Sequence, residues 1–156
     1  MNIAPRIRLL LIVLWVGSLW TIGYLVAPTL FATLNDRVLA GMVAGKLFRI
    51  EAWLSVFMAL SLLILMATTV AQGRVRKWMF RLVVAMLACT LIGYFGLQPM
   101  MASLREAAPD GVLSGDAKSQ FGMLHGAASV FYMIQSVLGV FLIFRNDQSG
   151  ALSETK

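Results

Sequence analysis

Charged residues are scarce in this sequence: they make up 13% of its 156 residues, whereas 60% of the residues are hydrophobic. A soluble domain is typically about half apolar and roughly a quarter charged. The shortage of charge therefore argues against an ordinary soluble domain and indicates a protein that has lipid as its solvent. The net charge of +6 would suggest nucleic acid as a partner of a soluble protein. Here the basic residues flank apolar stretches, as they do in membrane proteins, so we expect a lipid bilayer and no nucleic acid as partner.

Metal-binding and catalytic residue types are also scarce. Cys89 is the single cysteine, which excludes an internal disulfide framework, and His125 is the single histidine. Zinc and copper sites usually need three or four donors, and these two residues should differ in membrane depth by roughly 15 Å. The ten methionines could offer thioether ligands to Cu(I), but methionine is a common apolar filler. Nucleophile elbows, phosphate loops and HExxH motifs are missing, so we expect no enzyme activity, no metal and no cofactor.

What the sequence does contain is four long stretches without Asp, Glu, Lys or Arg: Leu9–Asn35, Ala52–Gly73, Leu82–Leu104 and Ser119–Phe144. A membrane-spanning helix needs about 20 apolar residues, and helices satisfy their own backbone groups in lipid. We therefore predict an all-α integral membrane protein, a four-helix transmembrane bundle forming one membrane domain over residues 1–156. The spans are expected at about residues 9–31, 52–72, 80–99 and 120–144. The first stretch exceeds the roughly 7–15 residues of a signal-peptide core, so we expect a retained helix.

The segments between the spans carry further predictions. Residues 35–51 have apolar residues at helical spacing among basic ones, which favours a short interfacial helix between the first two spans. Within it, Arg49 and Glu51 are expected at most to form a surface ion pair at the mouth of the second helix. Residues 105–118 are expected to form a loop, and residues 145–156 a mobile cytoplasmic tail. No internal repeat is recognised, and no acidic or basic residue is expected inside a span.

The orientation follows from the distribution of basic residues. Four spans put both termini and the link between the second and third spans on one side of the membrane. That side has the larger set of basic residues: Arg6, Arg8, Arg74, Arg76, Lys77, Arg81, Arg145 and Lys156. The opposite side has Arg37, Lys46, Arg49, Arg105 and Lys118. The positive-inside rule then predicts a multi-pass protein of the cell inner membrane with both termini in the cytoplasm.

His125 lies on a polar face of the fourth span, together with Gly122, Ser129, Tyr132 and Ser136. One interpretation is a ligand-binding or proton-handling site that faces the bundle interior. The other is a neutral imidazole that forms a hydrogen bond with a neighbouring helix.

Uncharged polar residues also follow one face of each of the other spans. They could line a small polar cavity, or they could form ordinary hydrogen bonds between helices. The set comprises Gly17, Thr21, Tyr24, Pro28, Ser55, Ser61, Thr90, Tyr94, Gln98, Gln135 and Ser136. Two pairs with GxxxG spacing, Gly41/Gly45 and Gly122/Gly126, would allow close contact with another copy of the chain or with a membrane-protein partner.

Several short segments resemble the transmembrane protein 205-like family, also catalogued as domain of unknown function 4149. They are the stretch from Gly23 to Phe31, Ala40-Gly41, Gly45 to Phe48, Gln98-Pro99 with Met101, and Phe121 with His125-Gly126 and Ser129. The resemblance implies four membrane helices and no established reaction.

Under the predicted topology these segments all fall at the outer end of the bundle. We therefore predict a functional outer layer made of His125, Ser129, Gln98, Phe31, Lys46 and Phe48. The leading interpretation is a non-enzymatic membrane protein that binds or moves a small molecule or metal at its outer face. The alternative is a structural subunit or assembly factor of a larger membrane complex.

Overall fold

The computed structural model describes residues 3–69, 73–109 and 112–151, with side chains described as far as residue 146. Over these residues the chain forms helices and no strand. The elements are α1 (Ala4–Trp20), the π-helix η1 (Thr21–Val26), α2 (Ala27–Thr33), α3 (Arg37–Thr69), α4 (Arg74–Thr90), the π-helix η2 (Leu91–Gly96), α5 (Leu97–Glu106) and α6 (Gly115–Ala151).

These elements join into four rods that are long and apolar enough to cross a membrane: Ala4–Thr33, Arg37–Thr69, Arg74–Glu106 and Gly115–Asn146. The prediction of an all-α four-helix membrane bundle is therefore confirmed. Large apolar side chains cover the outside of the rods, among them Phe57, Ile64 and Phe144, each more than 60% exposed. Such an outer surface fits hydrocarbon as the surrounding medium.

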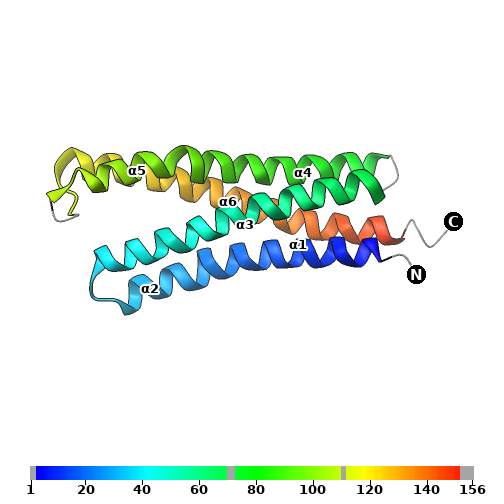
Figure 1. Ribbon diagram of the computed structural model, residues 1–156, viewed down its shortest axis with the longest axis horizontal. Helices are drawn as coiled ribbons and strands as arrows, with labels where there is room; N and C mark the ends of the chain where they lie inside the picture. Colours follow the sequence, from blue (N-terminus) through cyan, green and yellow to red (C-terminus); the bar gives the residue numbers. More distant parts are fainter. Residues whose placement is uncertain (1–2, 70–72, 110–111, 152–156) are drawn as a thin grey trace.

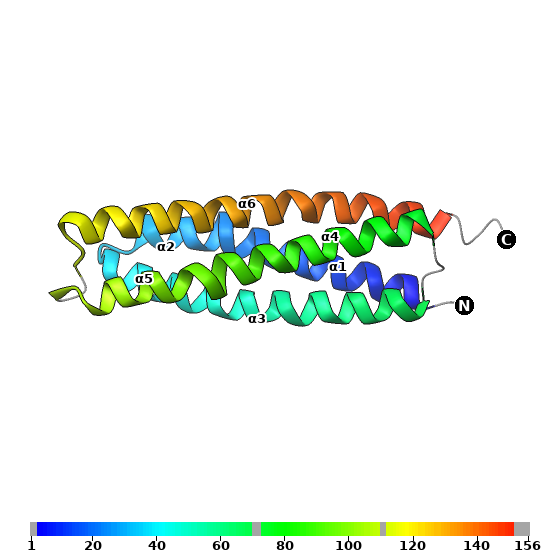
Figure 2. The same cartoon turned by 90° about the horizontal axis from the view of Figure 1, so that it is seen from above.

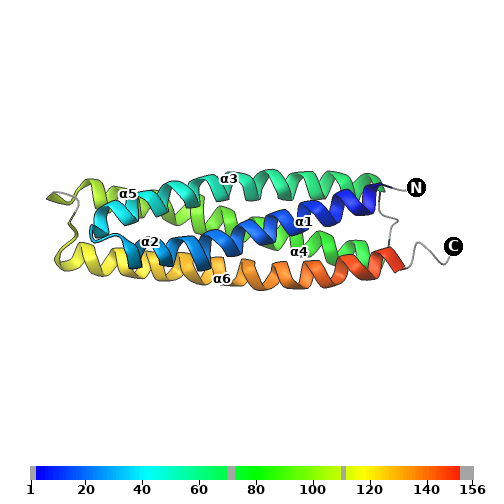
Figure 3. The same cartoon turned by 90° about the horizontal axis from the view of Figure 1, so that it is seen from below.

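The rods run antiparallel to their neighbours around the bundle (Figure 1). α1 packs against α3 and α6, and α4 packs against the same two helices. Figures 2 and 3 show both chain ends at one end of the bundle, here called the termini end. The opposite end, here called the loop end, holds residues 34–36 and the connection between α5 and α6. Both termini therefore lie on one side of the bundle, as the even number of rods requires.

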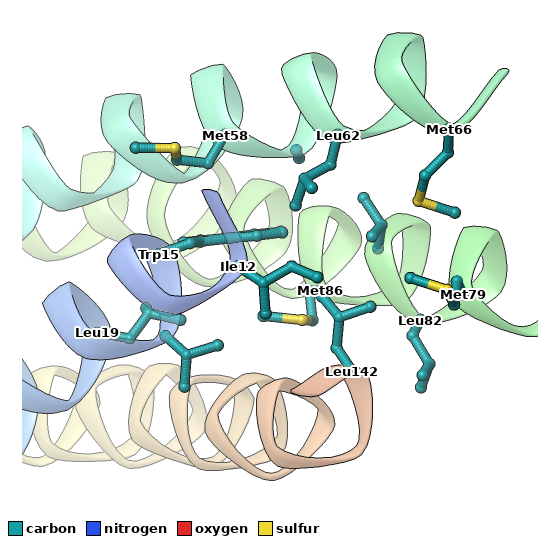
Figure 4. Packing of buried hydrophobic residues seen from close by; sticks show 13 residues of the cluster. Ile12, Trp15, Leu19, Met58, Leu62, Met66, Met79, Leu82, Met86 and Leu142 are labelled. Atoms are coloured by element: carbon teal, nitrogen blue, oxygen red, sulfur yellow. The ribbon is translucent and has the colours of Figure 1, made fainter. Parts of the chain in front are cut away.

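The apolar core fills the half of the bundle nearer the termini end (Figure 4). Its fully buried side chains include Trp15 and Ile12 from α1, Leu62 from α3, Met86 from α4 and Leu142 from α6. Toward the loop end, Figure 1 shows the α2–α3 pair diverging from the α5–α6 pair. The tight packing thus ends near mid-bundle, and this positions the site described below.

The structure reveals an internal repeat that sequence inspection missed. The first and third rods have the same order of elements, with starts at Ala4 and Arg74, Thr21 and Leu91, and Ala27 and Leu97. Each π-helix holds the tripeptide Ile-Gly-Tyr at the same place, with glycines Gly23 and Gly93. The repeated rods lie diagonally across the bundle and run in the same direction, so a pseudo-twofold axis along the bundle relates these two rods.

The π-helices precede prolines, which gives a physical reason for their position. A proline ring clashes with the carbonyl group four residues earlier in a regular helix, and it cannot donate a backbone hydrogen bond. For Pro28 that carbonyl belongs to Tyr24, and for Pro99 it belongs to Phe95, so both carbonyls lie inside a π-helix. The wider turn accommodates the ring, and the rod continues past the proline.

The expected interfacial helix over residues 35–51 is corrected. Residues 37–51 are the first part of α3, which runs without a break from Arg37 to Thr69. The segment contains no proline, and its small residues Ala40, Gly41 and Ala44 are buried against the bundle. The charged residues of this segment were interpreted as the start of the second span, but no helix-breaking residue ends the helix there.

The other connections differ in detail from the prediction. α5 ends at Glu106 and α6 begins at Gly115, so the connection is shorter than the expected loop over residues 105–118, and its residues 110–111 lie outside the described residues. The expected mobile tail over residues 145–156 begins inside α6, which continues to Ala151. Residues 152–156, and residues 70–72 of the expected second span, lie outside the described residues.

Candidate functional site

A cavity of about 540 Å³ occupies the bundle on the loop-end side of the apolar core. Small residues create much of this space, among them Ala44 and Gly45 on α3, Gly93 in η2 and Ala128 on α6. We call it the central cavity. Its volume is in the range of sites for small organic molecules.

The inner end of the central cavity contains Glu51, which is only 2% exposed. Glu51 lies near the middle of α3, about 20 Å or more from either end of that helix at a rise of 1.5 Å per residue. The expectation that no charged residue type lies inside a span, and that Glu51 belongs to the membrane surface, is therefore wrong. Continuation of α3 through residues 37–51 carries Glu51 into the bundle.

Hydrogen bonds hold one oxygen of the Glu51 carboxyl group. Trp15 Nε1 donates to Ser55 Oγ over 2.8 Å, and Gln135 Nε2 donates to the same oxygen over 3.4 Å. Both acceptor positions of the Ser55 hydroxyl are then used, so its proton is directed to Glu51 Oε1 at 3.2 Å. The Ser18 hydroxyl also lies 3.2 Å from Oε1. The other oxygen, Glu51 Oε2, is buried without any hydrogen-bond partner among the described residues.

Aromatic rings form a wall of the central cavity next to this carboxyl group. The ring of Tyr132 makes edge-to-face contacts with Phe48 (centroids 5.4 Å apart) and Tyr24 (6.2 Å). Tyr132 donates its hydroxyl proton to the carbonyl of Leu19, and Tyr24 donates to Ser136 Oγ. Both hydroxyl protons are donated to protein acceptors, so a molecule in the cavity would contact mainly the aromatic rings of these two tyrosines.

The part of the central cavity nearest the loop end contains Arg105, which belongs to the last turn of α5. Its guanidinium group lies 4.6 Å from the centre of the Phe121 ring. It also covers Gly41, where an added Cβ would be 3.2 Å from Arg105 Nη2. The Phe121 ring in turn stacks with His125 on the same helix, with centroids 6.1 Å apart.

The structure brings most of the predicted outer layer together. Phe31, Phe48, Gln98, His125 and Ser129 all line the central cavity. Lys46 does not: it is exposed, because its neighbour Gly45 takes the inward position on α3. The two interpretations of the other polar faces both apply, since Ser55 and Gln135 line the cavity and also form hydrogen bonds between helices.

His125 fits neither sequence interpretation fully. It is exposed, and the described residues give its imidazole a stacking contact within α6 but no hydrogen bond to another helix. The hydroxyl group of Ser129 donates to the backbone carbonyl of His125 over 2.8 Å. His125 therefore lies at the edge of the central cavity, whereas the buried lining residues Glu51 and Ser55 lie deeper in the bundle.

The sequence model of the family described as "Domain of unknown function (DUF4149)" matches residues 10–110. The chain belongs to this family. This match does not support the name transmembrane protein 205-like. No curated protein and no solved structure matches the chain.

The region of this DUF4149 protein covered by the family match includes Glu51, both π-helices and Arg105. The α6 residues of the site, including His125 and Tyr132, come after it. The match therefore covers the inner carboxyl group of the central cavity and three of the four rods.

Metal binding finds little support among the described residues of this DUF4149 protein. No three His, Cys, Asp or Glu side chains there lie close enough together to hold a metal ion. Cys89 and Glu51 both line the central cavity, but His125 belongs to its outer part. The site offers an isolated carboxyl group, aromatic rings and apolar surface, which is the chemistry of organic-molecule binding.

Glu51 is the main site residue that sequence reasoning missed, although a signal was present. Five residues follow one another at spacings of three and four, which places them on one face of a single helix: Gly41, Gly45, Phe48, Glu51 and Ser55. This face forms one wall of the central cavity. The Gly41/Gly45 pair therefore lines the interior and is not an outward contact surface for a partner.

Proposed function

We propose that this DUF4149 protein is a non-enzymatic membrane protein that binds a small organic molecule in its central cavity. The observation that carries the proposal is the carboxyl group of Glu51, a residue that lines the central cavity at mid-bundle and whose Oε2 is buried without a hydrogen-bond partner among the described residues. Burying a polar atom without a hydrogen bond costs about 1–3 kcal/mol, so a ligand that supplies the missing bond would recover this free energy. Ionisable residues within membrane spans are usually functional for this reason.

The groups around the central cavity support binding more than catalysis. Nucleophilic catalysis needs a hydroxyl or thiol group within hydrogen-bond reach of a base. The hydroxyl protons of Tyr24, Tyr132 and Ser129 go to protein acceptors, and the Ser55 hydroxyl is fully used within the bundle. These groups hold the cavity wall in place.

Movement of the ligand across the membrane is a second candidate function. The two π-helices interrupt the first and third rods at corresponding positions and border the central cavity. In secondary transporters, substrate sites lie near the bilayer midplane where structural repeats meet, next to Gly/Pro-interrupted helices. The repeat and the position of Glu51 both support this comparison.

The subunit alternative rests on the second glycine pair. Gly122 and Gly126 are exposed on α6, and a Cβ at either position would meet no atom within 4 Å. Such a surface would allow close approach of a helix from another copy or another membrane protein. It lies apart from the buried Glu51, so a partner there is compatible with ligand binding in the cavity.

A cavity-filling substitution tests the proposed function. Gly45→Phe places a ring in the central cavity without a clash at Cβ, whereas Gly122→Phe, the matched control, projects from the exposed face of α6. Calorimetric titration in lipid nanodiscs would use phenylbutylamine, phenylbutanol and phenylbutyrate as probes. At least one should bind the unaltered protein saturably, and Gly45→Phe should weaken that binding at least about tenfold while Gly122→Phe leaves it unchanged.

If none of the three probes binds, or if both variants bind as the unaltered protein does, the proposed function is refuted. Co-purification of a stoichiometric membrane partner that Gly122→Phe releases would instead favour the subunit alternative.

We further propose that the protein lies in the cell inner membrane with its termini end in the cytoplasm, as the basic residues near that end support. Cysteines introduced at exposed Gly73 and Ser114, in a Cys89→Ala background, would test this orientation. A membrane-impermeant maleimide should label Ser114→Cys in intact spheroplasts and label Gly73→Cys only after lysis. The opposite result would place the termini end outside the cell.

A further inference from the structure

We propose that the central cavity is specific for a lipophilic organic cation, an amine whose ammonium group pairs with Glu51 and whose apolar body lies against the aromatic wall. This inference rests on the proposed function and adds the chemical class of the ligand. Three features of the described residues carry it: the unpartnered oxygen, the aromatic rings around it and the route by which a ligand can enter.

The hydrogen bonds of Glu51 leave one position for a ligand. Trp15 and Gln135 both donate hydrogen bonds to the hydroxyl oxygen of Ser55. The Ser55 hydroxyl group therefore donates its own proton to Glu51 Oε1. Oε2 has no donor among the described residues, and Glu51 is a lining residue of the central cavity. The complementary ligand group is therefore a hydrogen-bond donor, and a positively charged donor forms the stronger bond with a carboxylate.

No basic side chain of the described cavity lining can neutralise Glu51 at short range. Arg105 is the only Lys or Arg residue among them. Its guanidinium group lies against Gly41, which is ten residues before Glu51 on the same helix, or about 15 Å along the axis. Arg105 is also engaged with the Phe121 ring. The described lining therefore supplies no cation beside Glu51, and an ammonium group of the ligand would take this place.

The aromatic wall adds a second attraction for a cation. An ammonium group is attracted to the faces of Tyr and Phe rings within about 6 Å, and the attraction grows when water is excluded. Tyr24, Phe48 and Tyr132 form one cluster on the cavity wall, and Tyr94 also lines the cavity. A carboxylate surrounded by such rings is selective for amines over neutral or anionic molecules of equal size.

Exposed lining residues indicate where a ligand would enter. Tyr24 and Phe31 from η1 and α2 are exposed on one side of the opening, and Val130 and Met133 from α6 are exposed on the other. These residues lie within the membrane-spanning rods, so the cavity opens sideways toward hydrocarbon. An amine with an apolar body can enter the central cavity from the bilayer without passing Arg105 near the loop end.

The affinities of three probes that have similar shape but different charge identify the class of ligand. Phenylbutylamine carries an ammonium group at neutral pH, phenylbutanol is neutral and phenylbutyrate is anionic. Calorimetric titration of the full chain in nanodiscs should show the tightest binding for the amine. Glu51→Gln keeps the size of the side chain and an acceptor for Ser55, and it should weaken amine binding at least about tenfold.

Phenylbutanol binding to Glu51→Gln provides the control for folding, because it needs an intact cavity and no charge. If the three probes bind equally, or if Glu51→Gln does not weaken amine binding, the inference fails while the proposed function stands. Preferential binding of phenylbutyrate that is lost in Arg105→Gln would assign the cavity to anions and also overturn it. If no probe binds at all, the proposed function fails as well.

Discussion

Replacing Trp15 with alanine is expected to lower the free energy of unfolding by about 3–5 kcal/mol. Trp15 is completely buried in the centre of the apolar core, so its removal leaves a cavity the size of an indole ring. It also removes the donor that fills one acceptor position of Ser55. Unfolding in mixed micelles by a titration with sodium dodecyl sulfate, followed by far-ultraviolet circular dichroism, would measure the change.

Trp20→Ala is the matched control, since Trp20 lies on the same rod but is 44% exposed on its outer side. Its replacement should change the free energy of unfolding by less than about 1 kcal/mol. Equal effects of the two substitutions would show that Trp15 is not in the interior, and the arrangement of α1 within the bundle would then be wrong.

Gly23→Ala is expected to destabilise the protein by about 1–3 kcal/mol, the usual range for overpacking. A Cβ at this position would overlap the ring of Tyr132. That ring has little freedom to move, because its hydroxyl group donates to the Leu19 carbonyl over 2.6 Å and its faces and edges contact Phe48 and Tyr24. The substitution should therefore disturb the aromatic wall as well as the fold, and the unfolding titration should detect it.

Gly17→Ala on the same rod is the control for Gly23→Ala. A Cβ at Gly17 would meet no atom within 4 Å, so alanine should be neutral or slightly stabilising there. If Gly23→Ala proves as stable as Gly17→Ala, then η1 does not press against Tyr132, and the shape of the cavity near Glu51 must differ from the one described.

The fold was predictable because it depends on one strong signal. Each of the four stretches without charge corresponds to one rod of the bundle; Leu34, Asn35 and Gly73 at their ends lie beyond the rods, and residues 70–72 are outside the described residues. The antiparallel order then follows from connections at alternate ends. It brings Phe31, Phe48, Gln98, His125 and Ser129 to one half of the bundle, as predicted. Their functional role stays a prediction.

The same signal misled the prediction of the site. Treating charge as the boundary of a span placed Glu51 at the membrane surface, whereas α3 continues for fourteen residues before it and buries it. Lys46 was included because it belongs to the segment from Gly45 to Phe48 that resembles the family, but helical geometry turns it outward beside the inward Gly45. Both errors arise because burial depends on the face of a continuous helix, and that face is known only once the helix boundaries are known.

The repeat also escaped detection, because its common signal is only the short Ile-Gly-Tyr segment and the spacing of a few small residues. Ile22 to Tyr24 and Ile92 to Tyr94 are the matching segments. Hydrophobic residues elsewhere in the two rods differ, since lipid accepts almost any apolar side chain. The position of the π-helices in three dimensions makes the correspondence plain.

The pseudo-twofold axis has a consequence for the number of acids at mid-membrane. The repeat pairs Tyr24 with Tyr94, and both line the central cavity, whereas Glu51 belongs to α3, outside the repeated rods. Perfect duplication would set two carboxylates against each other in hydrocarbon, where their mutual repulsion is poorly screened. Glu51 is instead the single Asp or Glu residue of the described cavity lining, so the acid lies on one side of the axis. An occupant of the space between the halves would therefore meet two chemically different faces, and only one orientation would suit it.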